Sequence, residues 1–183
     1  MGSYQAVEVN YDIQYKRHGI EKVVGSGATA EVRPCTDNRT HVLRAVKSIE
    51  KIDWRTRGQV LEEIEMLKVV SGRHPNIIQF FEYYEEWSMM NLIFEYCPKG
   101  TIDQAIKKRK VPPGEDWIAR LLHQLFDALM FLKFKTILHR DVKPANLLLS
   151  DDRTLKLADF GVACYCTGPL RSCEGTPAFF PPE

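Results

Sequence analysis

The run from His139 to Gly161, HRDVKPANLLLSDDRTLKLADFG, constrains this chain more than any other stretch. It holds two short apolar segments joined by Ser-Asp-Asp-Arg, a pattern that predicts a β-hairpin. Because a hairpin brings together the residues before and after it, Asp141 and Asn146 are predicted to face Asp159 across one cleft. Two carboxylates and an amide in such a place suit a hard divalent cation, which takes oxygen ligands and keeps some waters for substrate phosphates.

Size and charge limit the class of protein. With 183 residues, of which 44% are hydrophobic, the chain can bury a core as one domain or as two small lobes. The formal net charge is +1, so bulk electrostatics give no reason to expect a nucleic-acid or membrane partner.

The sequence carries no signal for secretion or membrane insertion. It has no apolar run long enough to span a bilayer and no charged-then-apolar leader, so we expect a soluble, cytoplasmic protein, with the nucleus left open. Ala6 stands where N-myristoylation requires Ser or Thr, so we expect no lipid. Five cysteines without a Cys-x-x-Cys pair indicate reduced thiols. A redox role for Cys164 and Cys166 is the alternative.

A stretch of small residues near the N-terminus is typical of a phosphate-binding turn. Two β-like segments, 20–24 and 31–32, flank the sequence Gly-Ser-Gly-Ala-Thr-Ala at 25–30. A turn with little side-chain bulk lets backbone N–H groups approach an anion closely. An ordinary hairpin is the alternative. Pro34 removes a ladder donor, so its strand is predicted to lie at a sheet edge.

An ion pair is predicted between a strand and a helix. Lys47 ends a short alternating strand and points inward, where a lysine is costly unless it is paired. Helical spacing over Val60–Val70 places Glu63 on the apolar side, whereas Glu62 and Glu65 point toward solvent. We therefore expect Glu63 to pair with Lys47. A solvated glutamate on a surface helix is the alternative.

The middle of the chain continues with two strands and a linker. Residues 77–84 and 90–96 are predicted to be strands, and Cys-Pro-Lys-Gly at 97–100 breaks the pattern. Thr101 and Gln104 then form a predicted capping box, a hydroxyl at a helix start with an amide three residues on.

Two helices are predicted after the linker. The first ends in the cations at 107–110, which favour a helix C-terminus; binding of a substrate or a membrane by this basic run is the alternative. Asp116 is predicted to cap the second, longer helix. The apolar stripe of that helix is predicted to be core and consists of Ile118, Leu121, Leu122, Leu125, Leu129 and Leu132.

Together these features resemble the eukaryotic protein kinases. His-Arg-Asp-x-Lys-x-x-Asn followed by Asp-Phe-Gly, within 139–161, resembles the kinase catalytic loop and magnesium loop. The small-residue turn, the strand lysine, the helix glutamate and the closing Pro-Pro-Glu at 181–183 are similar to further kinase motifs and come in the same order. The resemblance covers roughly residues 20–183.

The resemblance implies an α+β, bilobal fold. Its N-lobe has a five-stranded antiparallel sheet with helix C, and its C-lobe is truncated and mainly helical. The chain is accordingly divided into a lead-in (1–19), an N-lobe (20–96), a hinge (97–100) and a partial C-lobe that ends at the close of the activation segment (101–183).

The resemblance also implies a set of functional residues. Catalysis is assigned to Asp141, which accepts the proton of the substrate hydroxyl, together with Lys143 and Asn146. Asn146 and Asp159 are expected to hold Mg²⁺, the implied cofactor, with ATP as co-substrate. The ATP site is expected to comprise Gly25, Ser26, Gly27, Ala28, Val32, Ala45, Lys47, Glu63, Glu95, Cys97 and Leu148.

The implied activity is ATP-dependent phosphoryl transfer to Ser or Thr hydroxyls of protein substrates. Lys143 is typical of Ser/Thr kinases, and Thr176 is expected in the region that receives the residue after the acceptor. Ser172 occupies the usual activation-loop acceptor position and implies an upstream kinase as partner; a surface serine is the alternative.

Two stretches bear on the subfamily. EIEMLKVVSGRHPNII at 63–78 resembles the calcium/calmodulin-dependent kinase group. GTPAFFPPE at 175–183 is similar to kinases that phosphorylate other kinases, of the liver kinase B and calmodulin-kinase kinase types.

Departures from the kinase pattern leave a second function open. Ala30 replaces the third glycine of the phosphate turn, and Ala145 stands where many arginine-directed kinases have glutamate. Kinase domains continue beyond the position of Glu183. The alternative to an active kinase is a catalytically weak or inactive kinase-like module that binds nucleotide or a partner protein. Either these residues are the first two-thirds of a longer protein, or the chain is naturally short. In the second case, the apolar face of the helix 116–135 is expected to stay partly uncovered.

Overall fold

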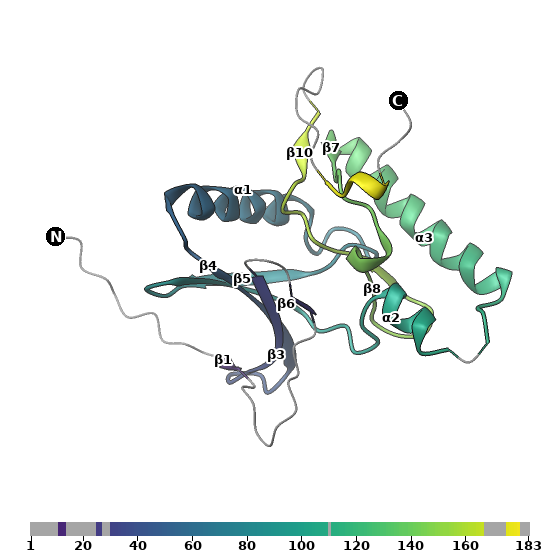
Figure 1. The fold of residues 1–183 in the computed structure, drawn as a ribbon, viewed down its shortest axis with the longest axis horizontal. Coiled ribbons are helices and arrows are strands. Elements are labelled where there is room, and N and C mark those ends of the chain that lie inside the picture. Colours follow the sequence, from purple (N-terminus) through teal and green to yellow (C-terminus); the bar gives the residue numbers. More distant parts are fainter. Residues whose placement is uncertain (1–10, 14–24, 27–29, 110, 167–174, 180–183) are drawn as a thin grey trace. The chain divides into compact units, whose positions relative to one another are not determined.

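The computed structural model describes residues 11–13, 25–26, 30–109, 111–166 and 175–179 (Figure 1). The chain gathers into two compact units. The first comprises residues up to 57 together with 80–96, and the second comprises 58–79 together with the chain from 97 onward. The break after 96 coincides with the start of the predicted hinge, whereas 58–79, expected in the N-lobe, lie in the second unit.

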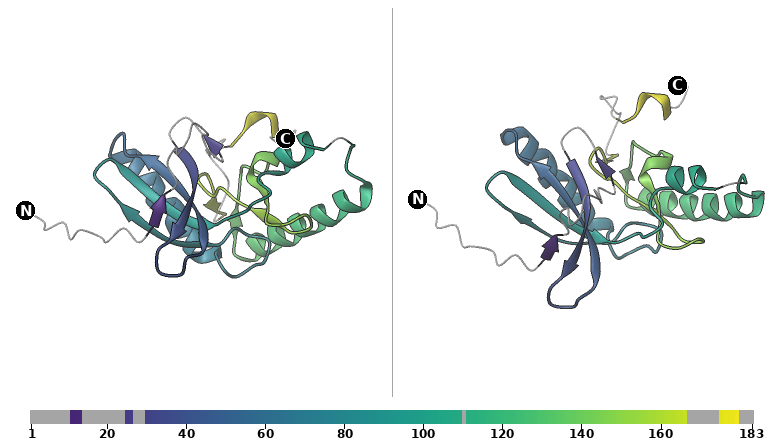
Figure 2. Two further views of the ribbon diagram at one scale, coloured as in Figure 1. Left: turned by 90° about the horizontal axis from the view of Figure 1, so that it is seen from below. Right: turned by 60° about the horizontal axis from the view of Figure 1, so that its bottom comes forward.

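The first unit is built on an antiparallel sheet of six strands, in the order β1-β3-β4-β6-β5, with β2 paired to β3. The strands cross one another at an angle, as in other twisted sheets (Figure 2). The sheet has one strand more than expected because β1 lies within the predicted lead-in; the strand predicted at 20–24 lies outside the described residues. The strands are β1 (Tyr11–Ile13), β2 (Gly25–Ser26), β3 (Ala30–Asp37), β4 (Leu43–Glu50), β5 (Phe80–Glu85) and β6 (Met89–Glu95).

β1 is held to the sheet by packing as well as by its ladder. It pairs with the C-terminal half of β3. The Tyr11 ring stacks on Tyr84, with the centroids 6.3 Å apart and the planes inclined by 6°, and the Tyr11 hydroxyl donates a hydrogen bond to Glu82. Residues 11–13 therefore belong to the sheet, which corrects the prediction that residues 1–19 are only a lead-in.

Pro34 lies inside the sheet, so the prediction of an edge strand is wrong. Along one side of β3, Pro34 is opposite Ala45 of β4. Along the other side, β2 pairs with Glu31 and Val32, and β1 pairs with residues 35–37. Pro34 falls between these two short ladders, at a position that neither of them uses. The sheet accommodates a residue without an N–H at that gap.

The core of the sheet is formed by side chains on its central strands. Val46 of β4 and Leu92 and Ile93 of β6 are fully buried. Cys35 of β3 is equally buried, and burial raises the pKa of its thiol to about 12. This thiol therefore stays protonated and unreactive near neutral pH.

A cluster of ion pairs ties the start of α1 (Trp54–Val70) to the end of β5. Arg57 donates from Nε and Nη2 to the two carboxylate oxygens of Glu85, at 2.9 and 3.0 Å. Lys51 Nζ lies 2.9 Å from Glu85 Oε1 and also donates to the main-chain oxygen of Glu86 at 2.6 Å. Hydrogen bonds from Arg57 and then Lys51 outweigh partial burial and lower the pKa of Glu85 to about 2.

The second unit combines helices with two small hairpins. β8 and β9 form the predicted hairpin, with Leu147 opposite Leu157 and Leu149 opposite Leu155, and β7 pairs with β10. α2 and α3 pack beside the β8–β9 hairpin (Figure 2). After α1, the elements are α2 (Ile102–Lys107), α3 (Glu115–Phe134), β7 (Ile137–Leu138), the 3₁₀ turn η1 (Pro144–Asn146), β8 (Leu147–Leu149), β9 (Leu155–Leu157), β10 (Cys164–Tyr165) and η2 (Pro177–Phe179).

α2 and α3 begin differently. α2 has the predicted capping box: Thr101 Oγ1 accepts from Gln104 N, and Gln104 Oε1 accepts from Thr101 N. α3 begins at Glu115 with Gly114 as its N-cap, so the prediction that Asp116 caps it is wrong. Asp116 instead lies in the first turn, where a negative charge is favourable beside the unpaired N–H groups of the helix.

The apolar stripe of α3 is only partly core. Leu121, Leu125 and Leu132 are buried as predicted, but Ile118 and Leu122 are exposed, which corrects their placement in the core. A line of apolar residues at intervals of four along α3 is exposed, as expected for a partly uncovered face, and comprises Ile118, Leu122, Phe126, Met130 and Phe134.

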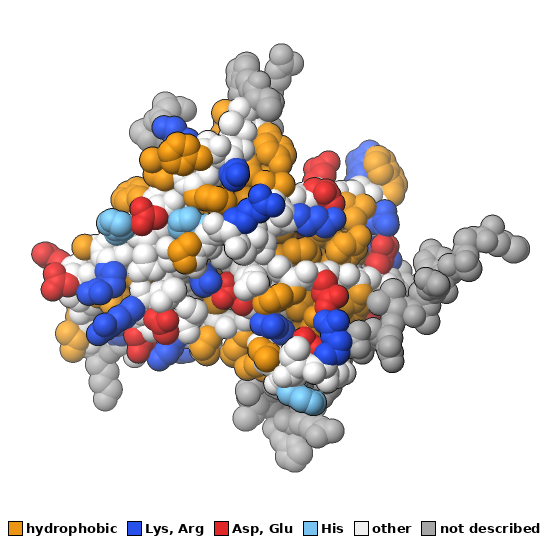
Figure 3. Space-filling model, turned by 180° about the vertical axis from the view of Figure 1, so that it is seen from behind, with side chains coloured by type: hydrophobic (Ala, Val, Ile, Leu, Met, Phe, Trp, Pro, Cys, Tyr) orange, Lys and Arg blue, Asp and Glu red, His pale blue; other side chains and the backbone are white. Residues whose placement is uncertain are grey.

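Surface charges are mixed. On the face shown in Figure 3, Lys and Arg side chains lie among Asp and Glu side chains instead of forming one large area of a single sign. Such a surface exerts little long-range attraction on polyanions. Of the helices described, none has both the length and the apolar composition needed to cross a bilayer.

Shortening a side chain is expected to lower the free energy of unfolding by different amounts on the two faces of α3. Leu132→Ala is expected to lower the free energy of unfolding by about 2–5 kcal/mol, because Leu132 is 1% exposed and its removal leaves a cavity. Phe126→Ala, at a side chain that is 60% exposed, is the matched control and is expected to cost less than about 1 kcal/mol. Urea denaturation followed by circular dichroism measures both, and equal losses would contradict the assignment of the faces.

Glu85 is expected to make stability depend on acid pH. Because its pKa is lowered in the folded chain, the ionised group stabilises the fold above the ordinary glutamate value of 4.5, and this contribution is lost as pH falls toward about 2. Glu85→Gln should therefore lower the melting temperature at pH 7, and the difference from the unmodified chain should shrink from pH 4.5 downward. Glu62→Gln, at an exposed glutamate of α1, serves as the control. A difference that stays constant with pH would contradict this role of Glu85.

Candidate functional site

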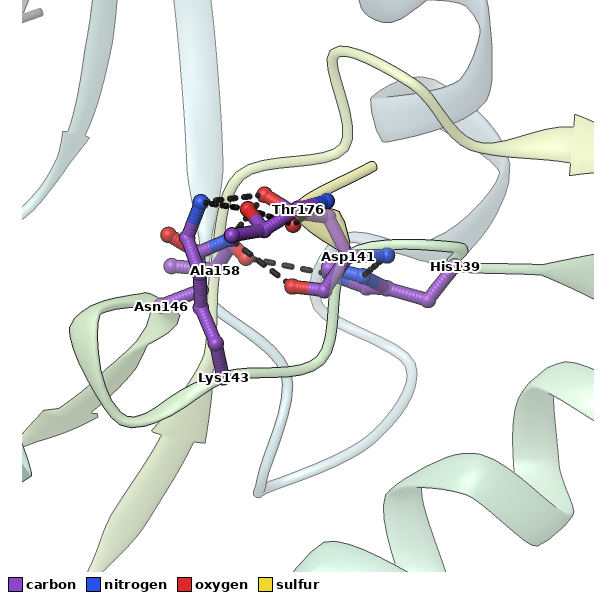
Figure 4. Close-up of polar contacts among 6 residues, drawn as sticks. All are labelled: His139, Asp141, Lys143, Asn146, Ala158 and Thr176. Atoms are coloured by element: carbon purple, nitrogen blue, oxygen red, sulfur yellow. Dashed lines mark hydrogen bonds and ion pairs between the residues drawn. The ribbon is translucent and has the colours of Figure 1, made fainter. Parts of the chain in front are cut away.

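The predicted catalytic loop follows β7 and is anchored by the buried ring of His139. This ring packs edge-on against Phe160, with the centroids 4.9 Å apart. Its Nε2 lies 3.0 Å from the carbonyl of Ala158, and Asp141 N–H donates to its Nδ1 at 3.3 Å (Figure 4). A carbonyl only accepts and an amide N–H only donates, so the ring is neutral with its proton on Nε2. Burial lowers the pKa of His139, which favours the same neutral form.

Asn146 connects the loop to the far end of the hairpin. Its Nδ2 donates to the main-chain oxygen of Asp141 at 2.9 Å and to Asp141 Oδ2 at 2.8 Å. Its main-chain oxygen accepts from Ala158 N at 2.9 Å, directly before Asp159. The hairpin thus brings these segments together as predicted. Both side-chain hydrogen bonds use Nδ2, which leaves the amide oxygen of Asn146 as a potential cation ligand.

The carboxylate of Asp141 is the centre of a dense hydrogen-bond network (Figure 4). Lys143 Nζ lies 2.8 Å from Asp141 Oδ2 and donates to Thr176 Oγ1 at 2.6 Å. Thr176 donates to Asp141 Oδ1 from its hydroxyl at 2.6 Å and from its main-chain N–H at 3.0 Å. Partial burial alone would raise the pKa of Asp141, but hydrogen bonds from Lys143, Thr176 and Asn146 together lower it. Asp141 is therefore ionised at neutral pH and accepts hydrogen bonds.

Two further carboxylates lie near Gly161. A Cβ at position 161 would lie 3.5 Å from Asp159 Oδ1 and 3.5 Å from Glu63 Oε2. Both side chains, one following β9 and the other from α1, therefore lie close to this position. Asp159 has a φ of 65°, a left-handed conformation that costs a non-glycine residue about 1–2 kcal/mol.

The helical phase predicted for α1 is confirmed. Glu63 is 6% exposed, whereas Glu62 and Glu65 are exposed. Lys47 lies in β4 opposite Val32 of β3. Because Lys47 belongs to the first unit and Glu63 to the second, their pairing stays a prediction.

The other candidates for the ATP site are divided between the two units. Gly27 and Ala28 lie outside the described residues, as does the phosphorylation candidate Ser172. Leu148 of β8 forms an isolated bridge with Thr101. The first unit holds Gly25, Ser26, Val32, Ala45, Lys47 and Glu95, and the second holds Glu63, Cys97 and Leu148.

The donor groups suit Mg²⁺ better than a transition metal. In the described part of the chain, no three His, Cys, Asp or Glu side chains gather as a closed metal site. Mg²⁺ characteristically takes one or two protein oxygen ligands, and waters and substrate phosphates complete its shell. The amide oxygen of Asn146 and the carboxylate of Asp159 are groups of that kind.

Sequence reasoning missed two residues that build this site. Thr176 was assigned only to substrate recognition, but it also bonds Asp141 directly. Asn76 was assigned no role, although it supports β9: its Nδ2 donates to Leu155 O at 2.9 Å, and its main-chain oxygen accepts from Leu157 N at 2.8 Å. Both contacts join residues far apart in the sequence, so no local pattern announces them.

The protein kinase domain family matches this sequence over residues 18–183, which includes every residue of the site. The chain belongs to the protein kinase family. Asp141, Lys143 and Asn146 stand in the order of the kinase sequence motif His-Arg-Asp-x-Lys-x-x-Asn, and Asp159 begins an Asp-Phe-Gly sequence.

Similar curated proteins are Ser/Thr kinases or kinase catalytic chains. Mouse serine/threonine-protein kinase DCLK3 is 36% identical over 180 residues, covering 96% of this chain and 22% of that protein. The human phosphorylase b kinase gamma catalytic chain, liver/testis isoform, is 34% identical over 179 residues, covering 92% and 44%. CBL-interacting serine/threonine-protein kinase 2 of Arabidopsis thaliana is 31% identical over 176 residues, covering 92% and 38%. The chain therefore spans less than half the length of these relatives.

Lys143→Met is expected to raise the pKa of Asp141, because it removes the ammonium group that bonds the Asp141 carboxylate. The carbon-13 chemical shift of the Asp141 carboxyl group, followed through a pH titration, measures this change. Lys133→Met, at an exposed lysine of α3, is the matched control and should leave the titration unchanged. An Asp141 pKa that is the same in all three proteins would contradict the network described here.

Proposed function

We propose that this chain carries out ATP-dependent transfer of a phosphoryl group to Ser or Thr hydroxyls of protein substrates. The observation that supports this most strongly is the ionised Asp141 carboxylate, which accepts a hydrogen bond from an alcohol, the hydroxyl of Thr176, beside the ammonium group of Lys143. A carboxylate held in this way can orient a substrate hydroxyl.

In the proposed reaction, the substrate hydroxyl donates a hydrogen bond to Asp141, which points its oxygen at the γ-phosphorus of ATP. A new oxygen–phosphorus bond forms, the bond between the γ-phosphorus and the β–γ bridging oxygen breaks, and ADP leaves. Asp141 receives the hydroxyl proton and later releases it to solvent. Lys143 balances negative charge near the acceptor, and Asn146 keeps the Asp141 carboxylate in place.

We assign the cation and nucleotide contacts by family membership. Asn146 and Asp159 would hold Mg²⁺, which supplies neutralisation of phosphate charge when bound. The ATP phosphates would lie against the turn 25–28 and Lys47, with Glu63 fixing that lysine. Val32, Ala45 and Leu148 would enclose the base, and the backbone at Glu95 and Cys97 would bond its edge. These assignments also treat 20–96 and 101–183 as the two lobes and 97–100 as the hinge.

We base the proposals for acceptor type and regulation on the same family membership. Lys143 with Thr176 favours Ser and Thr as acceptors, in agreement with the printed names of the relatives. Phosphorylation of Ser172 by an upstream kinase would place a charged group in the activation segment. The described cysteines are not in disulfide bonds, which supports a reducing compartment such as the cytoplasm.

A second candidate function is a kinase-like module that binds nucleotide or a partner protein with little or no turnover. The exposed apolar face of α3 is typical of a surface that contacts another polypeptide. Magnesium-dependent ATP binding without phosphate transfer would favour this alternative.

Asp141→Asn is expected to reduce phosphate transfer from labelled ATP to a generic protein substrate by about 100- to 10,000-fold, because the amide accepts no proton. ATP binding, measured by calorimetry in the presence of Mg²⁺, should change little. Asp127→Asn, at an exposed carboxylate of α3, is the control and should retain full transfer. Equal transfer by the Asp141→Asn variant and the unmodified chain would overturn the proposed role of Asp141.

A further inference from the structure

A groove of about 440 Å³ lies in the second unit, between the end of α2 and the β8–β9 turn. Its volume falls within the range of about 300–1,000 Å³ that is usual for ligand sites. None of its lining residues belongs to the network around Asp141 or to the ATP, metal and phosphorylation candidates. The groove is lined by Pro98, Lys99, Ala105, Lys108, Arg109, Leu149 and Asp152.

One wall of the groove is fixed by backbone hydrogen bonds. Lys99 N donates to Leu149 O at 3.3 Å, and Leu149 N donates to Gly100 O at 2.9 Å. Pro98 and Ala105 give the groove its exposed apolar surface, and the Leu149 side chain, which is 2% exposed, is buried behind it. The capping box at the start of α2 holds the adjacent helix in place.

The β8–β9 turn contributes Asp152 to the groove and is held by its own hydrogen bonds. Asp151 Oδ1 accepts from Arg153 N at 2.7 Å and from Thr154 N at 2.9 Å. Trp117 of α3 donates from its indole N–H to Asp152 O at 2.9 Å. The groove therefore exists before any ligand arrives, which lowers the entropic cost of binding.

The charges lining the groove are unbalanced. Lys99 is neutralised by Asp152, with 3.1 Å between Nζ and Oδ1. Lys108 and Arg109 have no carboxylate of the described residues within ion-pair distance. The guanidinium of Arg109 lies over the ring of Trp117, 4.4 Å from its centroid, and this contact restrains it beside the groove. Two cations thus line a groove of mixed polar and apolar surface, and neither has a carboxylate partner among the described residues.

We propose that this groove binds an acidic segment of a partner protein. Its carboxylates would pair with Lys108 and Arg109, and its aliphatic groups would lie on Pro98 and Ala105. The volume exceeds what a small inorganic anion needs, and a groove with two cations beside a small apolar surface suits a peptide better than a flat lipid surface. This binding goes beyond the proposed phosphoryl transfer and requires no turnover.

The test uses the whole chain and a fluorescein-labelled peptide of alternating Glu and Leu residues, with fluorescence anisotropy as the measurement. Lys108→Glu together with Arg109→Glu is expected to weaken binding at least about tenfold. Lys133→Glu together with Lys135→Glu, which reverses two exposed charges on α3, is the matched control and should weaken binding less than about twofold. The double variant Lys108→Ala, Arg109→Ala should also weaken peptide binding. It replaces the charge-reversed variant as the test if that variant fails to fold.

Three results would overturn the proposal. Equal weakening in the two charge-reversed proteins would assign binding to overall charge. Equal binding of a peptide of alternating Lys and Leu residues would remove the charge preference. Phosphatidylserine vesicles serve as a competitor of the peptide: if they displace the acidic peptide and bind the unmodified chain more tightly than the peptide does, the two cations would be assigned to a membrane surface. Because no ATP is present, a failure of phosphoryl transfer leaves the outcome of this test unaffected.

Discussion

The hydrogen bond between the neutral ring of His139 and the carbonyl of Ala158 joins the chain before the β8–β9 hairpin to the chain after it. The site depends on this link because its polar groups come from both sides. Asn146 repeats the connection through Ala158 N, and Asn76 holds β9 from the segment after α1. Buried groups bonded in this way resist displacement, since breaking one bond leaves a desolvated polar atom.

Electrostatics at the site follow from this scaffold. Donor groups from three residues converge on the Asp141 carboxylate and outweigh the cost of its partial burial, so it remains charged where a looser site would favour its neutral form. Thr176 is both donor to Asp141 and acceptor from Lys143, so one hydroxyl couples the loop to a segment 35 positions later in the sequence. The chemistry proposed for Asp141 therefore depends on the placement of the activation segment.

The features predicted correctly are those encoded within a few residues. The hairpin of β8 and β9, the burial of Glu63 and the capping box at Thr101 depend on local spacing. Ile118 and Leu122 were misplaced because periodicity identifies an apolar stripe but not what packs against it. The position of Pro34 inside the sheet and the pairing of β1 depend on which distant strands lie beside β3, and local sequence does not specify them. The contact between Thr176 and Asp141 likewise forms only in the folded chain.

The position of Pro34 has a mechanical consequence for the first unit. β1 and β2 share one side of β3 but pair with separate stretches of it, on either side of this residue. Among the described residues, Gly25 and Ser26 of β2 pair with Val32 and Glu31 of β3. Strain applied to β2 is not passed through a continuous ladder to β1 and the Tyr11–Tyr84 stack. In the described sheet, the two short strands are therefore linked to each other through β3 and not by a ladder of their own.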